Sequence, residues 1–315
     1  MILPSNITPS LCCIHVGLQE QKIKFNVMTY AQYKKLGKKE AMKVLADRSL
    51  NNIKTIHSIL KECTKNGWNY RIGSNVFPLM THPDLKFGVD DFYNADEIHA
   101  EFAAAAVTIK QNGIRCSMHP DQFVVPASPN PKVVENSIRD LEQHAMIMDM
   151  LDLPRSYEAP INIHMNCYND GNFSEVVERL EKVHKRLSKS VMSRLVYENE
   201  DKPRSWNTKL LYEYAHKECG IPITYDSHHH RCGNQYGNLT PKEACEMART
   251  TWGDFKPLFH FSNGKSSTTD RAHSDYVYEL HEELFDRPTD VDFEFKLKEI
   301  AINKISREKL LTIAG

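Results

Sequence analysis

The stretch PINIHMNCYNDGNFSEVVERLEKVHKRLSKSVMSRLVYEN (residues 160–199) contains the pattern that decides the fold of this chain. Two short runs rich in branched apolar residues, 160–165 and 194–199, flank a longer amphipathic segment, 174–189. This order predicts a strand, a helix and a second strand, with Ser174 as the N-cap of the helix. Repeated strand–helix units of this kind predict a parallel sheet.

The same alternation extends in both directions from this unit. Further strands are expected at 11–16, 70–74, 114–119, 222–227, 257–262 and 291–295, and further helices at 39–65, 97–113, 131–151, 206–220, 241–252 and 296–310. About eight such units at this length favour a closed (β/α)₈ TIM barrel of class α/β over an open doubly wound sheet. Neither GxGxxG nor a Walker motif supports the open alternative or a nucleotide cofactor. We predict one TIM-barrel domain spanning residues 1–315.

The amino-acid composition excludes several classes of protein. The net charge is −1 and 41% of residues are hydrophobic, so a large core is possible and no global basic field points to nucleic acid. Two local basic stretches, 34–39 and 182–189, are most simply solvated helix faces. The 8 cysteines form no CxxC pair, and the sequence contains neither a signal peptide nor an apolar run of membrane-spanning length. We expect a cytoplasmic, non-membrane protein with reduced thiols.

Histidines and carboxylates recur at the ends of the predicted strands. They are His119, His164, Glu198, Asp226, His229, His260, His273 and Glu294. One histidine after an apolar run is ordinarily a core or capping residue, but several polar groups around one barrel mouth are costly without a partner. Because TIM barrels build their sites at that face, and because imidazoles and carboxylates together bind divalent metals, we predict a cluster of several ions.

Carboxylates shared between two ions, with a third ion nearby, suit in-line displacement at phosphorus. One ion lowers the pKa of the attacking water while the others hold the phosphate and the leaving oxygen. Metal-assisted sugar isomerisation is the alternative chemistry. The imidazole-rich ligand set favours phosphodiester hydrolysis.

At this point the chain resembles the UV damage endonuclease family, which is related to the endonuclease IV-type metal nucleases. The resemblance rests on motifs along most of the chain: MTYAQYKKLGKKEA (28–41), YRIGSNVFPLMTHP (70–83), SMHPDQFVV (117–125), NIHMN (162–166), YENED (197–201), DSHHH (226–230), RAHSDY (271–276) and DFEFK (292–296). It implies a TIM barrel that nicks damaged double-stranded DNA 5′ to the lesion through a metal-bound hydroxide, leaving a 3′-hydroxyl. Manganese is the family's metal, at two or three ions per chain, and the same ligands would accept zinc or magnesium.

The resemblance also implies a role for individual residues. His119 and His164 would hold a first ion, which Glu198 bridges to a second. Asp226, His260 and Glu294 would complete the second ion, while His229 and His273 would hold a third. His82 would lie near the site and act with Glu198 in catalysis. Gln122 and Phe123 would enter the DNA helix opposite the lesion; without the resemblance, Phe123 reads equally well as a core residue.

Three positions depart from the family pattern. Leu258 stands where relatives often carry a lysine, Glu200 replaces an aspartate, and Cys13 replaces an aromatic residue of the first strand. These changes leave open the occupancy of the third ion site and the range of lesions accepted, and Leu258 leaves open an inactive DNA-binding protein stabilised by metal. The alternative enzymes are an apurinic-site endonuclease and a xylose-isomerase-like sugar isomerase. The expected partner is damaged duplex DNA, and the expected oligomeric state is a monomer.

Overall fold

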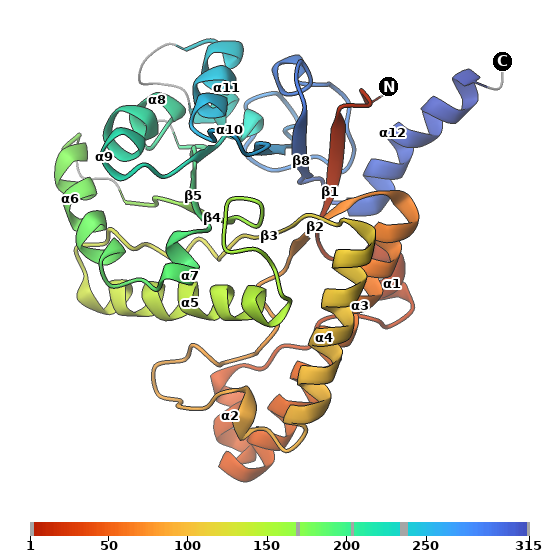
Figure 1. The fold of residues 1–315 in the computed structure, drawn as a ribbon, viewed down its shortest axis with the longest axis vertical. Helices are drawn as coiled ribbons and strands as arrows, with labels where there is room; N and C mark the ends of the chain where they lie inside the picture. Colours follow the sequence, from red (N-terminus) through yellow and green to blue (C-terminus); the bar gives the residue numbers. More distant parts are fainter. Residues whose placement is uncertain (1–2, 168–170, 203–204, 234–238, 314–315) are drawn as a thin grey trace.

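A parallel sheet curled into a (β/α)₈ barrel organises the structure (Figure 1), a computed structural model that describes residues 3–167, 171–202, 205–233 and 239–313. Its strands are β1 (Ile7–Cys13), β2 (Asn69–Ile72), β3 (Cys116–Met118), β4 (Ile161–His164), β5 (Leu195–Glu198), β6 (Ile223–Thr224), β7 (Leu258–Phe261) and β8 (Thr289–Phe293). They pair in the order β6-β5-β4-β3-β2-β1-β8-β7. A parallel bridge between Asp226 and His260 joins the two remaining edges. The predicted TIM barrel is confirmed.

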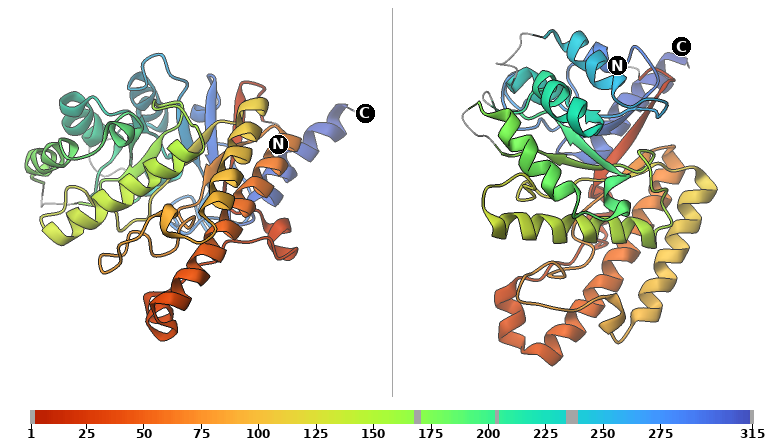
Figure 2. Two further views of the ribbon diagram at one scale, coloured as in Figure 1. Left: turned by 60° about the horizontal axis from the view of Figure 1, so that its bottom comes forward. Right: turned by 60° about the vertical axis from the view of Figure 1, so that its left-hand side comes forward.

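Helices follow the strands and lie outside the sheet (Figures 1 and 2). They are α1 (Val16–Glu20), α2 (Tyr30–Leu36), α3 (Lys38–Asn66), α4 (Ala95–Asn112), α5 (Pro131–Met150), α6 (Phe173–His184), α7 (Lys189–Met192), α8 (Thr208–Leu210), α9 (Lys217–Cys219), α10 (Ser227–Gly233), α11 (Pro241–Thr250) and α12 (Lys298–Ile313). Short 3₁₀ turns η1 (Val89–Asp91) and η3 (Glu282–Leu284) and a π-helical turn η2 (Leu211–His216) complete the set.

The predicted strands and the longer predicted helices are present, with shifts at several boundaries. Strand β1 begins at Ile7 rather than at residue 11. The N-cap of α6 is Asn172, whose side chain accepts a hydrogen bond from the Glu175 amide, and not Ser174. The N-cap therefore lies two residues earlier than predicted, and Phe173, the first residue of the helix, is buried in the core. Helices α1, α2, α7 and α10 were not predicted, because each is short, and the predicted helix 206–220 is divided into α8, η2 and α9.

The strand ends determine where the polar side chains meet. His164 and Glu198 are the last residues of β4 and β5 and are paired in register. His119 follows β3 directly, and Glu294 follows β8 directly. Since all strands run in one direction, these residues share the carboxyl end of the barrel, where βα loops build sites.

Candidate metal centre

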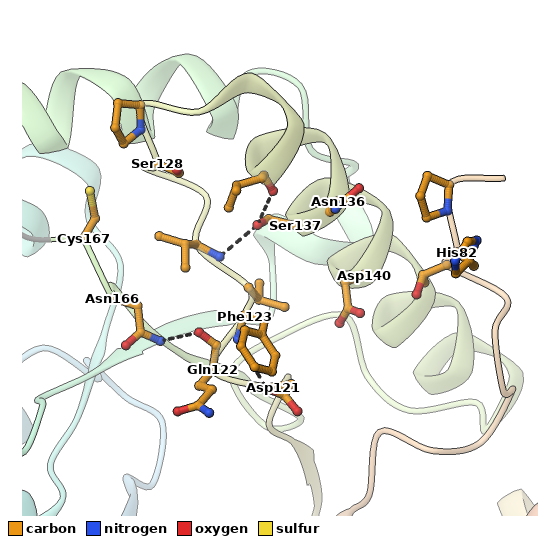
Figure 3. A pocket seen from close by; sticks show the side chains of 16 residues that line it. His82, Asp121, Gln122, Phe123, Ser128, Asn136, Ser137, Asp140, Asn166 and Cys167 are labelled. Carbon is orange, nitrogen blue, oxygen red and sulfur yellow. Dashed lines mark hydrogen bonds between the residues drawn. The ribbon is translucent and has the colours of Figure 1, made fainter. Parts of the chain in front are cut away.

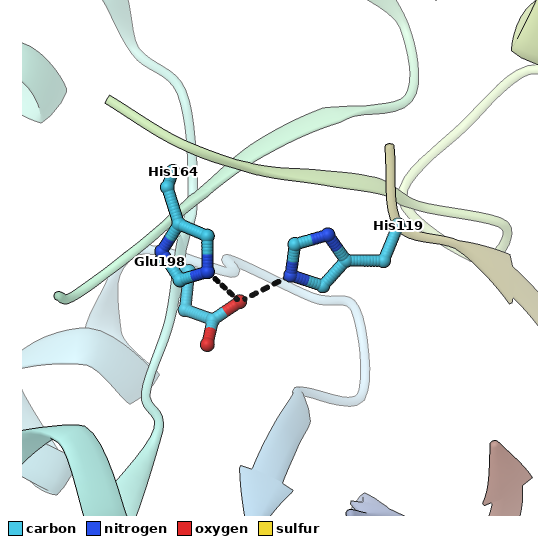
Figure 4. A group of neighbouring side chains, drawn as sticks. All are labelled: His119, His164 and Glu198. Carbon is cyan, nitrogen blue, oxygen red and sulfur yellow. Dashed lines mark hydrogen bonds and ion pairs between the residues drawn. The ribbon is translucent and has the colours of Figure 1, made fainter. Parts of the chain in front are cut away.

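The carboxylate of Glu198 is the hub of the polar cluster. Its Oε2 atom lies 3.0 Å from His119 Nε2 and 3.8 Å from His164 Nε2 (Figure 4). The His260 Nδ1 atom lies 3.2 Å from the same oxygen, and His229 Nδ1 lies 3.1 Å from Oε1. Both oxygens of one buried carboxylate therefore contact imidazoles from four other parts of the chain.

Two groups of donor atoms are close enough to share an ion each. His119, His164 and Glu198 form one group, and Glu198, Asp226 and His260 form the other. Glu198 belongs to both, which is the arrangement of a bridging ligand. The two groups match the first ion and part of the second ion expected from the sequence; their metal-binding role stays a prediction.

Glu294 and His229 border this core from two sides. The Glu294 Oε1 atom lies 3.2 Å from His260 Nδ1. The His229 amide donates to Asp226 Oδ1 at 2.7 Å, because α10 begins directly after Asp226 and brings both residues into one turn.

His273 lies at the outer edge of the cluster. Its Nδ1 atom is 2.6 Å from the Glu294 backbone oxygen and 3.8 Å from Glu294 Oε2. Its ring packs edge-on against His229 and against His228, which the sequence did not single out among the three consecutive histidines.

The donor atoms of the cluster fit divalent ions. Among the described residues, Glu198 Oε1, Asp226 Oδ2 and His260 Nδ1 are buried and lack a hydrogen bond of acceptable geometry. Buried polar atoms without a partner are costly, and coordination to a cation removes that cost. Imidazole nitrogens mixed with carboxylate oxygens suit manganese or zinc and also accept magnesium.

Protonation in the cluster is consistent with cation binding. Burial lowers the pKa of His164 to about 3, so its ring is neutral. Burial opposes the charge of Glu198, but the charge of the His260 imidazole and the hydrogen bonds from His119 and His229 outweigh it and hold the Glu198 pKa well below its usual range. Burial likewise opposes protonation of His260, but Glu198 and Glu294 raise the His260 pKa to about 9. A metal that binds His260 would displace this proton.

Beneath the cluster lie two charged residues that were not predicted from the sequence. Asp292 is fully buried on β8 in register with His260, and its Oδ2 atom lies 3.4 Å from His260 Nε2. Arg71 on β2 lies 3.6 Å from Asp292 and also forms an ion pair with Glu294. The alternation of Asp290, Asp292 and Glu294 could have shown that one face of this strand is acidic.

A cavity of about 770 Å³ lies between the loops that follow β2 and β3, and its lining residues Asp121 and Asn166 are two positions beyond His119 and His164. Gln122 and Phe123 line it from the β3 loop, and Figure 3 shows Asp140 of α5 between them and His82. The Phe123 side chain is 76% exposed, so Phe123 is not a core residue. The Gln122 backbone oxygen accepts a hydrogen bond from Asn166 Nδ2, 3.0 Å away.

His82 lies at the far wall of this cavity. Its ring stacks on Tyr30 with 3.9 Å between centroids, and its Nδ1 atom accepts the Asp84 amide at 3.2 Å. Within the described residues, His82 has no contact with the histidine–carboxylate cluster. A catalytic role for His82 stays a prediction.

The three departures from the family pattern have local explanations. Leu258 is buried in β7, where an apolar side chain needs no hydrogen-bond partner. The Glu200 side chain is also buried; it accepts the Asn166 amide at 2.7 Å and a hydrogen bond from Ser205. Cys13 ends β1 with a φ of 65°, and its backbone oxygen accepts from Tyr70 Oη at 2.9 Å. None of the three belongs to the two groups of donor atoms that could each hold an ion.

Comparison with known proteins identifies similar chains. The model of the UV-endonuclease UvdE family matches residues 10–314. A UV DNA damage endonuclease from Nostoc sp. is 31% identical over 305 residues, which cover 95% of this chain and 90% of that protein. The corresponding protein from Bacillus pumilus is 30% identical over 299 residues, covering 91% of this chain and 89% of that one.

Solved structures agree with these sequence relationships. The crystal structure of SacUVDE superposes with a TM-score of 0.80 at 25% identity, covering 97% of this chain and 99% of that chain. Endonuclease IV from Thermus thermophilus superposes with a TM-score of 0.54 at 13% identity, covering 80% and 93% of the two chains, and shares the fold. No helix in the described part of the chain is both long and apolar enough to cross a membrane.

Proposed function

Since the chain belongs to the UV-endonuclease UvdE family, we propose that it is a metal-dependent DNA repair enzyme that nicks duplex DNA 5′ to UV photoproducts and other damaged bases. It would act as a monomeric, single-domain TIM-barrel nuclease, needing no nucleotide cofactor and leaving a 3′-hydroxyl. The observation that carries the proposal is the convergence of buried, unpaired donor atoms on Glu198 at the barrel mouth.

The residues of the cluster would be shared among three ion positions. His119 and His164 would hold one ion, Asp226, His260 and Glu294 a second, and Glu198 would contact both. His229 and His273 would hold a third. Divalent ions bound there, manganese first among them, would lower the pKa of a water molecule and neutralise charge on the phosphate.

The protein's own contribution is to fix this geometry. Glu198 presents one oxygen to His119 and His164 and the other to His229, and burial excludes water from its sides. With ions bound, the shared Glu198 carboxylate would contribute to both positions, and the ions would hold a phosphodiester in the barrel mouth.

Recognition of the damaged step would come from the adjoining cavity. The exposed Phe123 ring, with Gln122 beside it, can fill the space left when a base step opens. A damaged step costs less to open than an intact one, so a side chain inserted there selects for damage.

This arrangement does not suit a small-molecule isomerase. An isomerase needs an enclosed pocket around a sugar and has no use for an exposed aromatic ring. The Phe123 ring is exposed at the edge of the cavity. This exposure is evidence for a large substrate such as duplex DNA.

The proposal is tested with four duplexes of one sequence. One is undamaged, one carries a single cyclobutane dimer, one a (6–4) photoproduct and one an abasic site. We expect a nick directly 5′ to each photoproduct in the presence of Mn²⁺ and none after chelation. Cleavage of the abasic duplex alone would indicate the endonuclease IV-like activity, and no cleavage of any duplex would refute the proposal.

A further inference from the structure

A basic segment lies beside the proposed DNA site and is not used by the proposed mechanism. It comprises α2 and the start of α3, residues 30–43, and is called the arm below. The arm carries one carboxylate, Glu40, and exposed lysines at 34, 35, 38, 39 and 43. Ion pairs form at Lys65, Lys242 and Lys256, but within the described residues none forms at an arm lysine. The arm therefore presents a net positive charge that is not neutralised by paired carboxylates.

The fold places the arm on the same face as the metal centre. It belongs to the connection that follows β1, and the connections after parallel barrel strands all lie at the carboxyl end. Tyr30 of the arm stacks on His82, which lines the cavity beside Phe123. The arm is thus continuous with one wall of the proposed lesion-binding cavity.

The length of α3 extends the arm beyond the barrel. Helix α3 has 29 residues, whereas its neighbour α4 has 18. At the rise of an α-helix the difference is about 16 Å. Both helices end just before a strand at the amino end of the barrel, so the extra length projects at the carboxyl end. Figures 1 and 2 show α2 and the beginning of α3 standing out from the rest of the molecule.

Favourable interaction with a helix dipole explains the positions of only some of the arm lysines. Lys34 and Lys35 lie in the last turn of α2, where cations are favoured, and Lys34 also lies 4.8 Å from the Tyr30 ring. Lys38 and Lys39 are the first two residues of α3, where the helix dipole disfavours cations. Positive charge at that position costs stability and is compensated when an external anion binds.

We propose that the arm binds the phosphate backbone of the DNA duplex to one side of the damaged step. This inference rests on the proposed function, since it takes the bound duplex to lie across the carboxyl end of the barrel. A projection of about 16 Å corresponds to about five base pairs of B-DNA. The arm would increase affinity for any duplex that extends far enough, damaged or intact, and would leave the choice of lesion to Gln122 and Phe123.

The test compares two variants with the same change of charge. The arm variant combines Lys34→Ala, Lys35→Ala, Lys38→Ala and Lys39→Ala. The control variant combines Lys61→Ala, Lys110→Ala, Lys185→Ala and Lys189→Ala, which remove exposed lysines near the amino end of the barrel. Dissociation constants are measured for undamaged and photoproduct-containing duplexes at several salt concentrations, and thermal melting verifies that both variants fold.

We expect the arm variant to bind both duplexes roughly tenfold more weakly at low salt, with a salt dependence reduced by about one unit of slope for each lysine–phosphate pair that is removed. The control variant should bind as the wild type does. With the photoproduct-containing duplex, the difference between arm variant and wild type should disappear when the side that faces the arm is shortened from about ten base pairs to about two, since the phosphates that the arm reaches are then missing. Shortening the opposite side of the damaged step in the same way should leave the difference unchanged. Two pairwise variants, at 34 and 35 or at 38 and 39, should each show part of the effect.

Equal affinities and equal salt slopes for the arm and control variants on the long duplex would overturn the inference. The proposed function is judged separately, by nicking. If the wild type binds duplex DNA through the arm but never nicks photoproducts, the proposed function fails and the arm inference stands. If the wild type nicks photoproducts and the arm variant binds like the control, only the arm inference fails.

Discussion

His260 and Asp292 contact each other across neighbouring strands, with His260 Nε2 3.4 Å from Asp292 Oδ2. The other ring nitrogen, Nδ1, lies 3.2 Å from Glu198 and from Glu294. Asp292 therefore faces the side of the imidazole that is turned away from the cluster. A proton on Nε2 would be held there, leaving the Nδ1 lone pair for a metal. Carboxylates behind metal-binding histidines orient the ring in this way.

The first prediction concerns this pair. Asp292→Asn should weaken metal binding by roughly tenfold to a hundredfold, because the neutral amide no longer raises the basicity of the His260 ring. Metal affinity is measured by competition with a chelator of known affinity. Asp290→Asn is the matched control, since Asp290 pairs with Arg115 and Lys256 instead of His260. An equal loss of metal affinity in the two variants would show that Asp292 affects only the stability of the fold and does not act on the His260 ring.

The second prediction separates recognition from chemistry. Phe123→Ala should weaken binding of a photoproduct-containing duplex by roughly tenfold to a hundredfold, because base–aromatic stacking is worth about 1–3 kcal/mol. Bound metal and affinity for undamaged duplex should hardly change. Val107→Ala removes exposed apolar surface from α4 and serves as the control. Loss of metal or of folding in Phe123→Ala would contradict a role in recognising damage.

The third prediction concerns acid stability. Burial lowers the pKa of His184 to about 4, and its Nε2 atom lies 2.6 Å from Tyr197 Oη. Below the ordinary histidine pKa of about 6.5, His184 binds a proton in the unfolded chain but not in the folded chain. The free energy of unfolding should therefore fall as the pH decreases from about 6.5 to about 4, and this contribution should be constant below that range.

The variant His184→Gln tests this dependence. It keeps a hydrogen-bonding group for Tyr197 but does not titrate, so its unfolding free energy should change less between pH 7 and pH 4.5 than that of the wild type. Urea denaturation at both values gives the comparison. A residual change is expected, since burial also lowers the pKa of His230 to about 4. Identical pH dependence in variant and wild type would exclude a contribution from His184.

Much of this architecture could be predicted because it follows local patterns. Apolar runs ending in His164 and Glu198 predicted both the strands and the face on which their side chains meet. The Asp226–His229 spacing predicted a shared turn, which α10 provides. These features depend on neighbours in sequence, and the barrel topology then brings strand ends together.

The rest depends on contacts between distant residues. Arg71 and Asp292 are 221 positions apart in the sequence. They come close because their strands, β2 and β8, both lie next to β1 in the sheet. The stacking of Tyr30 on His82, which joins the arm to the cavity, likewise depends on packing between two loops. No spacing rule within either segment reveals such pairs.

The proposed function requires that the cluster around Glu198 be a metal centre that nicks DNA at UV damage. The most direct test measures bound metal and nicking of UV-irradiated supercoiled plasmid for the wild type and for Glu198→Gln. The exposed Glu175→Gln is the control. We expect two or three ions in the wild type and in Glu175→Gln, with nicking that chelation abolishes. For Glu198→Gln we expect fewer ions, no nicking and an unchanged fold, because the site lies at the loop face of the barrel. A Glu198→Gln protein that keeps its metal and nicks irradiated plasmid at the wild-type rate would show that Glu198 is not part of a catalytic metal centre.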